Sequence, residues 1–299
     1  MPDPMLVAQL LVNGLLLAGI YALMAVGLNV IFGVIRILNM AHGEVLMLGG
    51  FGAFWIWRLL GFNPIIAVPL LAPVFFAAGY AFQRLVLQHL FSNRLGREQM
   101  SVEDSSLLAT YGLSLALVAL ARVLWTSDYR SVPFLRGSWL LGELIVSYSQ
   151  LAAFSAAAAM TGVLLLLLNF TRIGRAIRAT AQNHDLAESC GVTVRHVYAV
   201  TFGLGAAAAG VAGLMLSMIY AIYPEMGLDY SIRAFVVVIL GGLGSLSGSF
   251  VGALALGLSE SVCAFYLGAL PATIVPFLLI LAILLVRPTG IVASRKRQA

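Results

Sequence analysis

The stretch Thr171–Arg195, TRIGRAIRATAQNHDLAESCGVTVR, is the densest cluster of charge in the chain, and it lies between two apolar runs. Neither Leu144–Asn169 before it nor Val197–Pro224 after it contains a charged residue. Each run is long enough to cross a bilayer, because roughly 20 apolar residues cover about 30 Å of hydrocarbon as a helix. The pattern predicts two membrane spans joined by a helical, polar, basic loop, and docking on a soluble partner is one of the few tasks open to such a loop.

The composition indicates an integral membrane protein. Of the 299 residues, 61% are hydrophobic and 10% are charged, whereas soluble domains carry about 25% charged residues. Continuous apolar runs are typical of helices, whereas membrane β-barrels alternate in polarity. We therefore expect an all-α polytopic protein with about eight to nine spans. The further charge-free runs leave no room for a separate soluble domain and predict one transmembrane domain over 1–299: Pro4–Ile35, Val45–Trp57, Leu59–Gln83, Ser105–Ala121, Ala234–Ser259 and Ser261–Val286.

The basic residues predict the orientation, since short loops rich in Arg and Lys stay in the cytoplasm. Arg94 and Arg97, the cluster between Arg172 and Arg195, and the tail at 295–297 fall on one side when the spans are counted. In this path Leu59–Leu90 runs inward, Ser105–Trp125 outward to a mixed-charge loop at 128–143, Leu144–Phe170 inward and Val197–Tyr220 outward, so the N-terminus lies outside. Lipid headgroups and topology explain the net charge of +5 better than nucleic acid does.

Three features of the sequence are evidence against a signal peptide, a disulfide or metal site, and a nucleotide-binding loop. The start, MPDPMLV, has no basic residue, so it lacks the positive region of a signal peptide and the first span is expected to be retained. Cys190 lies in the polar loop and Cys263 in an apolar run, so we expect no disulfide and no metal site. The only lysine is Lys296, which excludes a phosphate-binding loop of the Gly-Lys-Ser/Thr type.

Two stretches do not fit ideal spanning helices. Two full spans need about 40 residues, but Ala234–Phe265 contains only 32. The glycine-rich stretch Gly241–Gly248 lies in the middle of this segment. Irregular backbone at membrane depth is tolerated where protein or a water-filled cavity surrounds it, so a broken or re-entrant hairpin is expected. The second stretch is Arg36–Glu44, followed by LGGFGAF, which resembles LGGLGSL from Leu240. Paired interruptions point to a transport site in repeat-built carriers, and close helix packing by small residues is the alternative.

Several polar residues within these stretches are candidates for a pathway or a gate. Ionisable residues inside a membrane are costly and often functional. Asn39, His42 and Glu44 form either a polar hinge at a pathway or a turn that meets water. Glu260 either is solvated or holds a gate closed, with the neighbouring Ser259 and Ser261 as hydrogen-bond partners.

Other candidates lie in the glycine-rich turn and after Pro224. The turn contributes Gly244, Ser245 and Ser247 as pathway residues. After Pro224, Glu225, Asp229 and Arg233 form a charged outer patch, which we interpret as ordinary solvated charge.

Three motifs together resemble one family, the permeases of branched-chain amino acid ABC transporters of the high-affinity leucine/isoleucine/valine type. They are GLNVIFGVIRILNMAHGEVLMLGGF (Gly27–Phe51), GRAIRATAQNHDLAESCGV (Gly174–Val192) and AFVVVILGGLGSLSGSFVGALALGLSES (Ala234–Ser261). The ending RPTGI at 287–291 is similar as well. The resemblance runs from about residue 6 to residue 291.

The resemblance extends to the loop at about 171–195. Coupling loops of ABC importers follow Glu-Ala-Ala, three residues and Gly, and Asp185, Ala187, Glu188 and Gly191 keep that spacing, although Leu and Asp replace two residues and the downstream Ile-x-Leu-Pro is absent. A short helix with small residues on one face can seat in a groove of a partner, and Gly191 would end it. The alternative is a solvated loop whose arginines only set the topology.

The resemblance implies a permease subunit of an ATP-driven importer in the bacterial inner membrane. Such a subunit is not an enzyme and holds no cofactor, because ATP and Mg²⁺ bind to two cytoplasmic ATPase partners. A second homologous permease and a periplasmic binding protein would complete the complex. We expect branched-chain or other hydrophobic amino acids as substrate, with urea or short amides as an alternative. A secondary carrier or channel is the alternative of another class, and an intramembrane hydrolase would need a Ser with a positioned His.

Overall fold

The computed structural model describes residues 4–89, 102–135, 137–287 and 290–292. Arg94, Arg97 and the basic tail at 295–297 lie outside these described residues. The elements in chain order are α1 (Pro4–Ile35), α2 (His42–Leu60), α3 (Pro64–Phe82), η1 (Gln83–Leu87), α5 (Val102–Trp125), β1 (Ser138–Leu141), β2 (Leu144–Ser147), α6 (Tyr148–Phe170), α7 (Arg172–Gln182), α8 (His184–Ser189), α9 (Val194–Leu216), α10 (Met226–Gly241), α11 (Leu246–Tyr266), α12 (Ala269–Ala272) and α13 (Val275–Val286).

The prediction of an all-α polytopic membrane protein is confirmed. In the described part of the chain, seven helices are long and apolar enough to cross a membrane. They are α1, α2, α3 with η1, α5, α6, α9 and α11. The helix α10 and the segment Leu270–Val286 are shorter. The expected number of eight to nine spans is reached when one or both of these shorter segments are counted with the seven.

Small residues build the centre of the bundle around α9. Every residue of the apolar window of α9 is buried, and α1, α2 and α3 pack against this helix. A methyl group on Gly213 would meet the carbonyl of Leu46, and one on Gly49 would meet the carbonyl of Gly210. Lipid tails are as apolar as the side chains, so close backbone approach and dispersion replace the hydrophobic effect as the source of packing energy. The glycine pattern therefore explains why α2 and α9 lie in contact.

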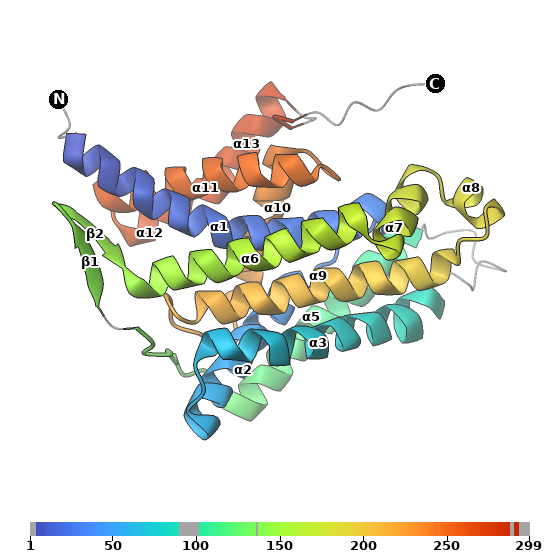
Figure 1. The fold of residues 1–299 in the computed structure, drawn as a ribbon, viewed down its shortest axis with the longest axis horizontal. Coiled ribbons are helices and arrows are strands. Elements are labelled where there is room, and N and C mark those ends of the chain that lie inside the picture. The colour runs from blue at the N-terminus through green and yellow to red at the C-terminus, as the bar shows by residue number, and fades with distance from the viewer. Residues whose placement is uncertain (1–3, 90–101, 136, 288–289, 293–299) are drawn as a thin grey trace.

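Figure 1 shows that the helices run roughly along one long axis and have different structures at their two ends. The N-terminus, the β1–β2 hairpin and α12 lie at one end. The short helices α7 and α8 lie at the other end, and they connect α6 to α9. We call these the hairpin end and the α8 end.

The predicted interruption at Arg36–Glu44 is a break between α1 and α2. After α1 ends at Ile35, Arg36 takes a positive φ of 59°, and residues 36–41 lead to the first turn of α2. His42 then lies beside Met24 of α1, so α2 begins inside the bundle. The start of α2 is therefore surrounded by protein, which is the condition under which irregular backbone is tolerated in a membrane.

The predicted hairpin at Ala234–Phe265 consists of two unequal helices. The first, α10, begins earlier than expected, at Met226, and its 16 residues cover about 24 Å, less than a full span. The second, α11, has 21 residues and is long enough to cross. Gly242 and Gly244, with φ of 101° and 79°, form the turn between them. Only the first arm is therefore too short for a full span.

Part of one predicted span is a strand. The apolar run that begins at Leu144 was expected to be helical throughout, but Leu144–Ser147 pairs antiparallel with Ser138–Leu141. Gly142, with φ of 67°, lies between the two strands and allows the tight connection. A short apolar run cannot be assigned to strand or helix by periodicity alone, which explains the error.

The remaining boundaries differ from the predictions by a few residues. The apolar stretch from Leu59 is divided, because α2 ends at Leu60 and Gly61 adopts a left-handed conformation after it. Asn63 then caps α3 by accepting a hydrogen bond from the amide of Ile65 at 2.8 Å. The glycine and the cap together turn the chain within three residues.

Candidate functional site

The predicted cluster of Asn39, His42 and Glu44 is buried in the centre of the bundle. The Asn39 carboxamide oxygen accepts a hydrogen bond from the amide of Ala41 at 3.1 Å and thereby shapes the start of α2. The Nε2 atom of His42 donates to the carbonyl oxygen of Met24 at 3.1 Å, since a carbonyl can only accept. This burial disagrees with the alternative of a turn that meets water, whereas a role in a pathway stays a prediction.

The first turns of α2 and α10 meet around Glu44. The amide of Gly43 donates to the hydroxyl of Ser231 at 2.9 Å, and Gly227 packs directly against Glu44. Ser114 of α5 also lies beside this carboxyl group. Among the described residues, Oε2 of Glu44 has no hydrogen-bond partner. The contacts explain why glycine stands at positions 43 and 227, where a larger residue would separate the two helices.

Asn29, which the sequence analysis did not single out, holds the glycine-rich turn. Its oxygen accepts from the amide of Gly244 at 2.9 Å, while its amide donates to the carbonyl of Ser245 at 3.1 Å and to the hydroxyl of Ser249 at 2.6 Å. The Ser245 hydroxyl caps α11 through the amide of Gly248 at 3.0 Å. The turn is therefore a specific structure, and Ser247 is exposed on it.

Glu260 is part of a buried ion pair. Its Oε1 atom accepts a hydrogen bond from Nε of Arg233 at 2.9 Å, and its Oε2 atom accepts one from the hydroxyl of Tyr21 at 2.5 Å. The side chains of Arg233 and Glu260 are 17% and 8% exposed. The predicted serine partners are wrong, since Ser259 donates to Ala255 of its own helix and Ser261 to Leu10 of α1.

A cavity of about 560 Å³ opens beside this ion pair. Along α1 it extends from Leu10 to Tyr21, about 16 Å of helix. The other lining residues come from α6, α10, α11, α12, and from residues 219–223, which lie between α9 and α10. Because the first turns of α1 lie at the hairpin end, the cavity belongs to that half of the molecule (Figure 1).

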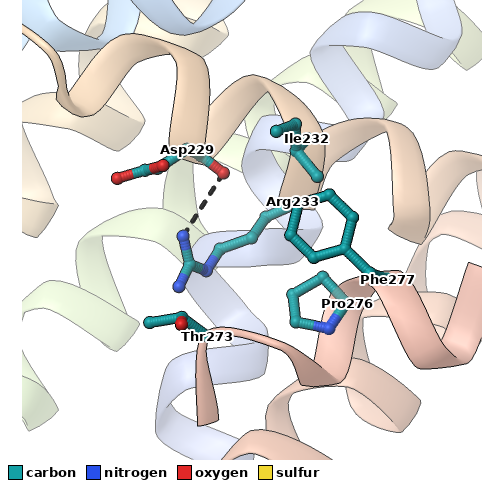
Figure 2. A pocket seen from close by; sticks show the side chains of 6 residues that line it. All are labelled: Asp229, Ile232, Arg233, Thr273, Pro276 and Phe277. Atoms are coloured by element: carbon teal, nitrogen blue, oxygen red, sulfur yellow. Dashed lines mark hydrogen bonds between the residues drawn. The ribbon is translucent and has the colours of Figure 1, made fainter. Parts of the chain in front are cut away.

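A smaller pocket of about 230 Å³ shares Asp229, Arg233 and Thr273 with this cavity. Figure 2 shows the Arg233 side chain between Asp229 and Thr273, with Nη1 donating to the carbonyl oxygen of Asp229 at 3.3 Å. The Asp229 carboxylate accepts from the hydroxyl of Tyr223 at 2.9 Å. Burial and this hydrogen bond raise the pKa of Tyr223 to about 12, so the phenol remains a donor at neutral pH.

The interpretation of Glu225, Asp229 and Arg233 as one solvated patch is wrong for Arg233, whereas Asp229 is exposed and Glu225 is partly exposed. Glu225 forms an exposed ion pair with Arg122 at 2.7 Å, with side chains 41% and 55% exposed. Arg233, one helical turn after Asp229, instead points toward Glu260 on α11. Asp229 joins the cavity together with Arg233. The sequence could not pair Arg233 with Glu260, because helix packing and not sequence proximity brings them together.

The predicted loop residues gather on α8 at the opposite end. Asn183 caps α8 through the amide of Leu186 at 3.0 Å. Asp185 and Glu188 are exposed, while Ala187 is buried. Gly191 follows the helix with a left-handed φ of 85°, and its neighbour Val192 donates to the carbonyl of Ala187 at 3.0 Å. As predicted, the helix ends before Gly191.

The predicted pathway residues thus form three separate groups, and α8 forms a fourth. One group is the start of α2, the second is the glycine-rich turn and the third is Glu260 with its cavity. Both cysteines are free thiols. In the described part of the chain, no group of three or more metal-ligating side chains occurs.

Known proteins are similar to this chain over nearly its whole length. Residues 10–286 match a family described as the permease component of the branched-chain amino acid transport system. The chain is 34% identical to the high-affinity branched-chain amino acid transport system permease protein BraD of Pseudomonas aeruginosa, with 97% of each chain covered. It is 30% identical to LivH of Escherichia coli, a permease protein with the same description, over 95% of this chain and 94% of that protein. A probable LivH of Methanocaldococcus jannaschii is 26% identical, over 95% and 91%.

Proposed function

The chain belongs to the branched-chain amino acid permease family, and from this premise we propose that it is a transmembrane permease subunit of an ATP-binding-cassette importer. The observation that carries the proposal is the match to BraD over 97% of both chains, which leaves no large segment with a separate origin. The single domain over 1–299 would form part of the translocation path. We propose branched-chain or other hydrophobic amino acids as the substrate, because the relatives are named for that transport.

ATP hydrolysis would take place in partner subunits. We propose two cytoplasmic ATPases that bind ATP and Mg²⁺, a second homologous permease and a soluble binding protein on the outer side. The chain itself would be no enzyme and would hold no cofactor. The bacterial inner membrane is the corresponding location, with the α8 end in the cytoplasm.

The geometry of α8 supports a contact with an ATPase. Ala187 fixes the helix to the protein, while the exposed Leu186, Asp185 and Glu188 are available to a partner. An exposed leucine flanked by two carboxylates can insert into a groove and pair with cations at its rim. The preceding helix α7 packs on α1, α6 and α9, so a displacement of α8 would reach the centre of the bundle.

Purification and transport together test this proposal. A tagged chain purified from its native host should bring an ATPase and a second permease with it, and the complex in proteoliposomes should take up leucine only with ATP and the binding protein. Uptake driven by an ion gradient without any ATPase would overturn the importer. Tight binding of urea by the soluble partner, without binding of leucine, would overturn the substrate.

A further inference from the structure

The cavity at the hairpin end contains paired charges of opposite sign at its wall. We propose that this cavity is a binding site for the zwitterionic head group of an amino acid, with Arg233 taking the carboxylate and Glu260 taking the ammonium group. This inference rests on the proposed function and assigns a substrate site to the permease itself. The volume of about 560 Å³ lies within the usual range for small-molecule sites, about 300–1,000 Å³.

The ion pair is positioned so that a ligand can reach both partners. Arg233 and Glu260 come from different helices, α10 and α11, and both line the cavity. Nε and Nη1 of Arg233 donate to Glu260 and to the carbonyl of Asp229. Among the described residues, Nη2 donates no hydrogen bond, and a full edge of the guanidinium becomes available to a carboxylate when the contact with Glu260 opens. The planar fork of arginine suits a carboxylate in a two-bond geometry.

A zwitterion can replace the contact between Arg233 and Glu260 without leaving either charge unpaired. An uncompensated charge at a buried position is costly, because it loses water and gains nothing in return. The carboxylate of an amino acid compensates Arg233, and its ammonium group compensates Glu260, so both side chains remain neutralised. Tyr21 keeps Glu260 oriented through its hydroxyl, and the carbonyl of Asp229 can accept a further N–H from the ammonium group.

Neutral or singly charged solutes lack this property. Urea carries no charge, so it cannot compensate either side chain when the pair opens. A carboxylate without an amino group would leave Glu260 unpaired, and an amine without a carboxylate would leave Arg233 unpaired. The cavity would therefore select against the urea and amide substrates that the family resemblance left open.

Apolar residues in one part of the remaining lining suit an aliphatic side chain, whereas other lining residues, among them Asn13, Gln150 and Ser261, are polar. Leu10 and Leu17 contribute one wall from α1, Ile219 contributes from the loop before α10, and Ala264 and Phe265 contribute from α11. The polar and apolar parts thus lie within one cavity, in the combination that a small-molecule site requires. A leucine side chain would bury its methyl groups there while its head group lies on the ion pair.

Protection of a cysteine against labelling tests the site directly in the assembled transporter. Ala264→Cys, in a chain that lacks Cys190 and Cys263, places one thiol in the cavity lining. In nanodiscs, L-leucine should slow its reaction with a hydrophilic maleimide in a saturable manner. At equal concentration, 4-methylpentanoate, isopentylamine and urea should not. A chain whose only thiol is Ser127→Cys, at an exposed position after α5, should react at the same rate with and without leucine.

The double variant Arg233→Gln with Glu260→Gln should remove the protection. The two amides can hydrogen bond to each other, so no unpaired buried charge remains to prevent folding. Loss of two charge-assisted contacts should raise the leucine concentration for half protection by about a hundredfold or more. Arg233→Lys, which keeps the charge but not the fork, should raise it by about tenfold. The exposed pair offers the matched control, Arg122→Gln with Glu225→Gln, which should keep the normal value.

The outcomes separate this inference from the proposed function. Protection by leucine that is the same in the parent, the double amide and the Arg233→Lys variant would overturn the assignment of the ion pair. Absence of protection at any leucine concentration, in a complex that still takes up leucine with ATP, would overturn the site and leave the importer intact. Protection by urea or by either singly charged analogue as effective as that by leucine would overturn the zwitterion requirement.

Discussion

At the scale of single residues, polar side chains inside the bundle fix irregular backbone that apolar packing cannot specify. The carboxamide of Asn29 uses both its donor and its acceptor on the α10–α11 turn. Glu260 uses both carboxylate oxygens on Arg233 and Tyr21. In a low-dielectric interior these bonds are strong when complete, and loss of one partner is costly.

Replacement of Asn29 by Ala should destabilise the protein. The change removes the acceptor of the Gly244 amide and one donor to the buried Ser249 hydroxyl, at a total cost of about 1–3 kcal/mol. The carbonyl of Ser245 keeps its hydrogen bond from the Ser249 amide. Thermal unfolding of the detergent-solubilised chain should show a lower midpoint. The control Asn169→Ala, at an exposed position, should leave the midpoint unchanged. Equal midpoints for the two variants would show that the turn does not depend on Asn29.

A second residue-scale prediction compares two carboxylates. Glu260→Gln leaves the Arg233 charge buried and uncompensated, so we expect a loss of about 3 kcal/mol or more in unfolding free energy. Glu225→Gln breaks the exposed pair with Arg122 and should cost less than about 1 kcal/mol. Chemical denaturation of both variants checks the order. A loss from Glu225→Gln as large as that from Glu260→Gln would contradict the burial argument.

At the scale of elements, continuous apolar runs predicted most helices but not the ones that begin or end inside the protein. The bounds of α1 follow directly from the charge-free run Pro4–Ile35, because lipid requires an unbroken apolar helix. The strand Leu144–Ser147 was predicted as helix, because its apolar residues also occur in membrane-spanning helices. The early start of α10 at Met226 was missed because charged residues inside the fold resemble a solvated loop.

The candidate site was predictable only in part, and the reason is spatial. His42, Glu44 and Glu260 stood out because charge is rare in apolar runs. The sequence did not distinguish Arg233 or Tyr21 as site residues. Arg233 follows other charged residues, and tyrosine is common in membrane spans. Their role arises from the packing of α1, α10 and α11, which the sequence does not report.

The glycine-rich turn provides a prediction at this scale. Gly244→Leu should abolish transport, because φ of 79° costs a residue with a side chain about 1–2 kcal/mol. An added Cβ already touches the Cα of Gly33 at 3.6 Å, so the remaining atoms of leucine must also fit beside α1. Gly162→Leu on α6 is the matched control, since no atom lies within 4 Å of the position of an added Cβ. Uptake of leucine by the two complexes measures the difference. Normal uptake with Gly244→Leu would show that the turn tolerates another backbone conformation.

The helix α8 provides a second prediction at the scale of elements. Gly191→Trp and Asp185→Lys should leave assembly with the second permease intact but uncouple leucine uptake from ATP hydrolysis, because Asp185 is exposed on α8 and Gly191 is exposed in the turn that ends it. Gly191→Ala carries the same left-handed backbone strain without the bulk and should retain more coupling than Gly191→Trp. The ratio of leucine transported to ATP hydrolysed is the measurement. Normal ratios in both bulky and charge-reversed variants would exclude α8 as the coupling element.

At the scale of the whole molecule, the cavity at the hairpin end and the glycine-rich turn lie on different parts of α1. The cavity extends along Leu10–Tyr21, whereas the turn contacts Asn29 and Gly33, about 12 Å and about 18 Å further along the helix than Tyr21. Of the cavity-lining residues on α1, Tyr21 is the one nearest in sequence to the turn, and it contacts Glu260. An importer must open one side while the other is closed, so these two regions are expected to respond in opposite directions to the state of the ATPases.

Cysteine accessibility tests this alternation in the assembled complex. Single cysteines at Ser245 and Ser247, in a chain without Cys190 and Cys263, should react with small hydrophilic thiol reagents, because Ser247 is exposed and Ser245 is half-buried on the turn. Trapping the ATPases with nucleotide should change the reactivity of both positions, and it should change the reactivity of a cysteine at Ala264 in the opposite direction. A movement of the turn explains such a reversal, whereas general loosening of the protein would raise all three rates together. If both turn positions are inert in every nucleotide state, the turn is buried scaffold and the pathway does not pass along it.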